Sequence, residues 1–141
     1  MEKQWLFSYG TLQDPDIQIA LFGSICVKKN AKLTGWSLYA SHEDGYLFIK
    51  PDPSGTVDGC ILEIDTNAIH TADRWEEVPY YIREKVLITL GDNTKQEVWV
   101  YTRRSAKGKP YAGKQMSIVN RQVVLNEVAS LKKQKGIVTF S

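Results

Sequence analysis

The chain has 141 residues, of which 43% are hydrophobic and 24% charged, and this is enough to build a core without disulfides or metal. The formal net charge of +2 gives no electrostatic argument for nucleic acid, and no apolar run approaches the roughly 18 residues that span a bilayer. Since no signal-peptide pattern opens the chain, we expect a cytoplasmic protein that forms one domain over residues 1–141 and binds neither nucleic acid nor membrane.

The chain opens with an apolar, aromatic-rich run at residues 5–8, which is typical of a buried strand. A turn made by Tyr9, Gly10, Thr11 and Leu12 follows it, and we name this segment the 9–12 turn. Because Gly10 has no Cβ, the backbone can come close to a ligand, and successive N–H groups in such a turn can bind an anion. A glycine after a strand is also often only a turn, and the tetrapeptide alone leaves this alternative open.

A short helix is predicted next, with Asp14 as its N-cap, Pro15 at the first helical position and Gly23 at its end. Gly91, Asp92 and Asn93 form a turn that joins two strand-like segments as a hairpin. The strand-like segments cover residues 27–39 with a bend at Gly35, 46–50, 56–65, 82–90 and 96–102. Helical spacing of apolar residues predicts a short helix at 67–76 and a longer C-terminal helix at 116–133.

Many short strands interrupted by few helices predict an α+β fold. We expect a small mixed β-barrel with flanking short helices, followed over residues 105–141 by a loop and a C-terminal helix. If the first strand is central, the 9–12 turn lies at its C-terminal edge, where sheet proteins tend to bind ligands.

The cysteines and the basic residues do not predict a site. Cys26 and Cys60 lie among apolar residues without His or Cys at metal-ligand spacing, so we expect core thiols and no metal site. The last third of the chain is basic, and we expect solvated surface there, with a polyanion-binding face as the alternative. Its basic residues include Arg103, Arg104, Lys107, Lys109, Lys114, Lys132, Lys133 and Lys135.

The best candidate for proton transfer is Glu76, at the end of the helix predicted for residues 67–76. It follows Trp75 and precedes the helix-breaking Val78 and Pro79, and an aromatic setting raises the pKa of a carboxyl toward the range useful for catalysis. Helical periodicity places Glu76 on the side of the apolar residues and turns Glu77 toward solvent. Two solvated carboxylates at a helix end are the alternative. Arg83 could pair with Glu76 or Glu84, or form an exposed ion pair.

Seven sequence blocks together resemble the gamma-glutamylcyclotransferase-like family, in particular its gamma-glutamylamine cyclotransferase-type branch. The resemblance covers about residues 3–103. The blocks are YGTL at 9–12, GWSLY at 35–39, GYLF at 45–48, VDGCILEI at 57–64, DRWE at 73–76, YYIREKV at 80–86 and WVY at 99–101.

The resemblance implies a small mixed β-barrel with flanking helices and an enzyme that needs no cofactor. Such an enzyme cyclises a gamma-glutamyl group to 5-oxoproline and releases the attached amine or amino acid, so its partner is a small gamma-glutamyl substrate. The resemblance also implies that the 9–12 turn holds the glutamyl moiety and that Glu76 is the general acid/base. Tyr81 matches an aromatic position near the carboxylate, and Tyr101 could line the same cleft; for both, ordinary core packing is the alternative.

One departure from the family pattern concerns Glu77, which stands where the family usually has glycine. A second carboxylate beside Glu76 could raise the pKa of Glu76 further or displace the helix end. A catalytically inactive protein that binds a small ligand or has a regulatory role on the same fold is therefore the alternative to an enzyme.

Overall fold

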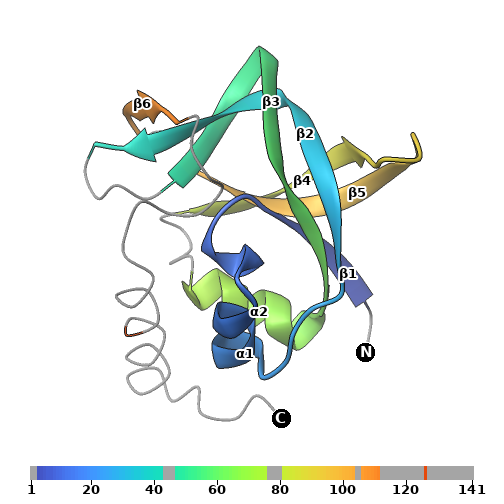
Figure 1. Cartoon of the computed structure of the whole chain (residues 1–141). Coiled ribbons are helices and arrows are strands. Elements are labelled where there is room, and N and C mark those ends of the chain that lie inside the picture. The colour runs from blue at the N-terminus through green and yellow to red at the C-terminus, as the bar shows by residue number, and fades with distance from the viewer. Residues whose placement is uncertain (1–2, 43–46, 76–80, 104–105, 112–125, 127–141) are drawn as a thin grey trace.

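A closed, mixed β-barrel forms the centre of the fold (Figure 1). The computed structural model describes residues 3–42, 47–75, 81–103, 106–111 and 126. The strands pair in the order β3-β1-β5-β4-β2, and pairing of β2 with β3 closes the ring. β1 and β5 are parallel and the other pairs are antiparallel, which confirms the predicted mixed barrel. The barrel strands are β1 (Lys3–Ser8), β2 (Lys28–Ser41), β3 (Leu47–Asp65), β4 (Ile82–Thr89) and β5 (Lys95–Thr102).

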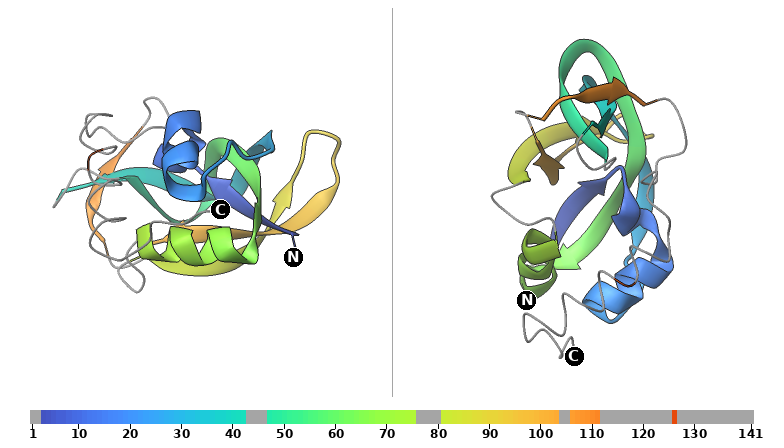
Figure 2. Two further views of the ribbon diagram at one scale, coloured as in Figure 1. Left: turned by 90° about the horizontal axis from the view of Figure 1, so that it is seen from below. Right: turned by 90° about the vertical axis from the view of Figure 1, so that its left-hand side faces the viewer.

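Two helices lie side by side at one end of the barrel, as Figures 1 and 2 show: α1 (Pro15–Phe22) and α2 (Thr66–Trp75). α1 has the predicted boundaries, because the Asp14 side chain accepts a hydrogen bond from the Asp16 amide at 2.8 Å and Gly23, at φ 81°, ends the helix. The 3₁₀ helix η1 (Thr11–Gln13) connects β1 to α1. In the described part of the chain, no helix is both long and apolar enough to cross a membrane. The helix predicted for residues 116–133 lies outside the described residues, Asn126 excepted.

Two strand predictions were wrong. The segments 46–50 and 56–65 are one strand, β3, although the sequence between them carries Pro51 and Pro53. The pairing of β2 with β3 shifts there, from Thr34 opposite Thr56 to Trp36 opposite Pro51, and a bulge absorbs the extra residues opposite Gly35. Gly35 has φ 91°, which suits glycine.

The second error concerns the basic segment after β5, which the sequence predicts as a loop. It contains a three-residue strand, β6 (Gly108–Pro110), that pairs with the end of β2. Nothing in its short basic sequence indicates a strand, because the pairing depends on the β2 edge that receives it.

The barrel wall separates two apolar clusters, as expected from the alternation of strand side chains between two faces. On β1, Leu6 faces the helices while Phe7 faces the barrel interior. On β5, Val100 faces the interior and Tyr101 the helix side. The interior cluster also contains Leu33, Trp36, Ile49, Val57, Ile61, Ile88 and Val98. The helix-side cluster also contains Leu12, Ile17, Leu21, Leu62, Ile69 and Ala72.

The side chain of Gln18 on α1 is fully buried and links η1 to the segment that leads into β2. Its Nε2 donates to the Leu12 carbonyl at 2.8 Å, and its Oε1 accepts from the Cys26 amide at 2.9 Å. A buried amide with both ends satisfied is typical of a structural brace. Gln18 therefore holds the end of the 9–12 turn in place.

We expect Gly59→Ala to destabilise the barrel by about 1–3 kcal/mol, the usual cost of overpacking. A Cβ at Gly59 on β3 would lie 2.3 Å from the Ser8 carbonyl oxygen and 2.9 Å from Phe7 Cζ, so the end of β1 would have to move. Urea unfolding measures the effect. Gly91→Ala is the matched control, because a Cβ there meets no described residue within 4 Å. An equal loss in both variants would contradict the prediction.

We expect Gln18→Leu to lower the free energy of unfolding by about 1–3 kcal/mol, because the buried Leu12 carbonyl and Cys26 amide would each lose a partner. Thermal unfolding followed by circular dichroism measures this loss. Gln96→Leu, at a half-buried position on β5, is the control for the change in side-chain type. An unchanged melting temperature in Gln18→Leu would show that Gln18 is not a brace.

Candidate functional site

The candidate site begins with the 9–12 turn, directly after β1. The Tyr9 ring is 7% exposed and packs in the interior cluster, and its Oη donates to the Tyr101 carbonyl at 2.7 Å. The Tyr9 side chain is therefore committed to packing and to β5.

Gly10 and Leu12 shape the rest of the turn. A Cβ at Gly10 would meet nothing within 4 Å among the described residues, so none of them blocks approach to the backbone there. The Gly10 carbonyl accepts from the Gln13 amide at 3.1 Å, and the Leu12 side chain packs in the helix-side cluster. η1 begins at Thr11, and amides in the first turn of a helix have no acceptor within that helix.

The C-terminal end of α2 is fastened to the barrel by Asp73. Its Oδ1 accepts from Arg83 Nε at 2.8 Å and from Tyr101 Oη at 2.7 Å, and its Oδ2 accepts from Arg83 Nη2 at 3.0 Å. Both side chains of the ion pair are only 21% exposed. A bidentate, partly buried pair of this kind is stronger and more directional than an exposed one.

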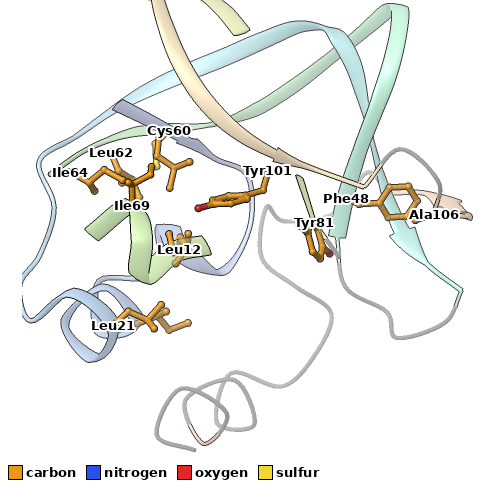
Figure 3. Close-up of a cluster of buried hydrophobic side chains, with 13 residues drawn as sticks. Leu12, Leu21, Phe48, Cys60, Leu62, Ile64, Ile69, Tyr81, Tyr101 and Ala106 are labelled. Atoms are coloured by element: carbon orange, nitrogen blue, oxygen red, sulfur yellow. The ribbon is translucent and has the colours of Figure 1, made fainter. Parts of the chain in front are cut away.

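A second anchor follows at Tyr81, directly before β4. Tyr81 is buried, and its Oη donates to the Leu47 carbonyl on β3 at 2.8 Å. The Arg103 guanidinium lies 5.4 Å from the centre of the Tyr81 ring, a cation–π contact. Figure 3 shows Tyr81 and Tyr101 in the same cluster as Leu12. Leu12 and Tyr81 thus share this cluster, whereas the Tyr9 ring lies in the other one.

Tyr101 connects the 9–12 turn to the end of α2. Its carbonyl accepts from Tyr9, and its phenol donates to Asp73, so one residue of β5 contacts both elements. The sequence singled out Tyr101 only as a residue that could line a cleft. The structure shows it as the connection between the two.

Other expectations about this region have different outcomes. The predicted catalytic residue Glu76, and its neighbour Glu77, lie outside the described residues; Trp75, the last described residue of α2, directly precedes them. Arg83 pairs with Asp73, so the expectation of an exposed ion pair and that of a pair with Glu84 were wrong, while the alternative partner Glu76 lies outside the described residues. The expectation of solvated surface was wrong for Arg103, which is 5% exposed.

Asp73 was missed as an anchor, although a signal for it exists. It is an acidic residue on the edge of the apolar face of a short amphipathic helix, and Arg83 is the second residue of the strand that follows. The sequence does not show that they pair, because an acid on α2 and a base on β4 come into contact only when the helix packs against the barrel.

The thiols are part of the core. Burial raises the pKa of the Cys26 thiol to about 11 and also raises the pKa of Cys60, so both stay protonated near neutral pH. Both cysteines are free. Within the described ranges, no three His, Cys, Asp or Glu side chains gather in a group that could hold a metal ion.

Known proteins give a consistent picture of the family. The sequence model of the family described as gamma-glutamyl cyclotransferase, AIG2-like, matches residues 6–117. AIG2-like protein C of Arabidopsis thaliana is 30% identical over 92 residues, which are 64% of this chain and 53% of that protein. A Methanocaldococcus jannaschii protein, described as a gamma-glutamylcyclotransferase and candidate RNase, is 26% identical over 104 residues, which are 72% of this chain and 47% of that protein.

The fold has solved counterparts. A structure described as a gamma-glutamyl cyclotransferase superposes with a TM-score of 0.70 over 97% of this chain and 82% of that one, at 13% identity, which shows the fold. The chain spans about half the length of the curated relatives that it matches. The family match extends beyond residue 103, where the sequence resemblance ends, and it covers most of the chain. The chain therefore belongs to the gamma-glutamyl cyclotransferase, AIG2-like family.

Proposed function

We propose that the chain is a gamma-glutamyl cyclotransferase-like enzyme, which cyclises a gamma-glutamyl group to 5-oxoproline and releases an amine or amino acid. In this proposal Glu76 is the general acid/base and the 9–12 turn holds the glutamyl moiety. The observation that carries the proposal is the hydrogen-bonded path from Tyr9 through Tyr101 to Asp73, because it ties that turn to the helix end that directly precedes Glu76.

The reaction needs positioning and proton transfer. The α-amine nitrogen of the substrate attacks its own γ-carbonyl carbon, and the amide bond to the leaving nitrogen breaks. The Glu76 carboxylate takes the proton that the attacking nitrogen loses and gives it to the leaving nitrogen. Holding the flexible glutamyl chain in a folded geometry supplies much of the rate, since it replaces a random encounter of the two groups.

The 9–12 turn suits the anionic part of the substrate. No described residue would contact a Cβ at Gly10, which suits the close approach of a ligand to the backbone, and the first amides of η1 are donors without acceptors in that helix. In the proposal these amides hold the α-carboxylate or the oxyanion that develops at the γ-carbonyl. Tyr81 supplies an aromatic wall from the same cluster as Leu12.

The first test measures 5-oxoproline release from a panel of gamma-glutamyl amino acids and gamma-glutamyl amines. We expect Glu76→Gln to lower kcat by about 10²-fold or more, because the amide cannot accept the proton, while ligand binding is kept. Glu77→Gln is the matched control and should retain most of the activity.

Two outcomes would contradict this assignment. Equal activity of wild type and Glu76→Gln would remove Glu76 from the mechanism. No turnover on any panel member, together with a rise in melting temperature on adding the same compounds, would favour the inactive small-ligand binding protein, for which Glu77 in place of the family's usual glycine is the supporting observation.

A further inference from the structure

We infer that Asp73, Arg83 and Tyr101 form a positioning unit, here named the clasp, that sets where the chain leaves α2 relative to the 9–12 turn. The inference rests on the proposed function, in which the residue that follows Trp75 is the proton carrier. The clasp residues do not contact substrate in this account; they act through the elements that they join.

The first argument is the geometry of the carboxylate. Asp73 accepts three hydrogen bonds, two from the Arg83 guanidinium and one from the Tyr101 phenol, between 2.7 and 3.0 Å. The paired fork of Arg83 fixes the plane of the carboxylate as well as its distance. The end of α2 is thereby held in one orientation on β4 and β5.

The second argument is that Arg83 is itself held in place. Its guanidinium lies 4.2 Å from the centre of the Trp99 ring. Trp99 Nε1 in turn donates to Gln4 Oε1 on β1 at 2.6 Å, and Gln4 Nε2 donates to Thr66 Oγ1 at the start of α2 at 3.4 Å. Polar contacts therefore fasten α2 to the outer barrel wall at both of its ends.

The third argument is that α2 does not need the clasp in order to dock. Ile69 and Ala72 are buried in the helix-side cluster, and packing of an apolar face is what stabilises a short helix in a protein. The clasp adds orientation at the last turn of α2, where a small displacement would move the following residue. A misplacement of about 1 Å at a reacting group can cost up to roughly 10²-fold in rate.

The fourth argument is the connection to the opposite side of the proposed site. The Tyr101 backbone accepts from Tyr9 while its phenol reaches Asp73, so the clasp and the 9–12 turn share one residue. Removing the phenol oxygen alone leaves the Tyr9 contact in place. Tyr101→Phe therefore removes the hydrogen bond to Asp73 and keeps the one from Tyr9.

The decisive experiment compares Tyr101→Phe with Tyr111→Phe in the 5-oxoproline assay. Tyr111 is half-buried against the interior cluster and does not belong to the clasp, which makes it a matched control. We expect Tyr101→Phe to lower kcat about tenfold with KM changed less than about threefold, since the substrate turn is untouched. Tyr111→Phe should stay within about twofold of wild type.

Two further pairs separate positioning from simple charge. Asp73→Asn should lower kcat. Glu97→Gln should not lower it, although it breaks the more exposed ion pair between Glu97 on β5 and Lys85 on β4. Arg83→Lys should lose nearly as much kcat as Arg83→Gln, because an ammonium cannot form the paired fork. In the Asp73→Asn, Tyr101→Phe double variant, the loss should be smaller than the product of the single losses.

The outcomes distinguish this inference from the proposed function. An active wild type whose kcat survives Tyr101→Phe and Asp73→Asn would overturn the clasp and leave the proposed function standing. A wild type that releases no 5-oxoproline from any substrate would overturn the proposed function itself. Each variant is assayed at a temperature where circular dichroism shows it fully folded, so that loss of the fold is not mistaken for loss of positioning. Wild-type kcat in Arg83→Lys would overturn the inference.

Discussion

The hydrogen bond from the Tyr101 phenol to Asp73 is the contact on which the arrangement of the proposed site depends. At 2.7 Å it joins β5 to the last turn of α2, and the backbone of the same tyrosine accepts from Tyr9 at the start of the 9–12 turn. Two segments that lie more than sixty residues apart in sequence are thus related through one side chain and its own carbonyl. Because Tyr9 and Asp73 both donate to or accept from Tyr101, a shift of either segment relative to β5 would break a hydrogen bond.

The barrel determines where such a site can lie. The described interior is filled by apolar side chains from several strands, as is usual for a barrel with few strands. Polar contacts that hold α2 and the 9–12 turn lie instead on the outer wall beneath α2 and at the strand end that carries the turn. Gly59 permits the close approach of β3 to the end of β1, and Gln18 braces the turn from α1. Packing and buried hydrogen bonds therefore hold the backbone of the 9–12 turn in place.

Local patterns predicted much of the fold. Capping at Asp14 and Gly23, the hairpin turn at residues 91–93 and the strand alternation are encoded by neighbouring residues, and the structure confirms them. The continuous β3 and the strand β6 were missed, because a bulge and an edge pairing depend on the partner strand. The same reason explains why the partner of Arg83 and the burial of Arg103 were missed. Strand alternation predicts which side of the sheet a residue faces, but not that a helix or an aromatic ring covers that side. Glu76 was proposed from a motif and an aromatic neighbourhood and stays a proposal.

The clasp also affects the balance of charge around the proposed proton carrier. Residues 73–77 contain three carboxylates, Asp73, Glu76 and Glu77, beside one arginine, Arg74, whose side chain is exposed. Like charges that lie close together raise the pKa of a carboxyl, and in the proposal Glu77, which stands where the family usually has glycine, is the nearest such neighbour of Glu76 in sequence. Arg83 comes from another strand and compensates the charge of Asp73 through a fixed bidentate contact. The ion pair that orients the end of α2 therefore also neutralises one of the two carboxylates that neighbour the proposed proton carrier in sequence.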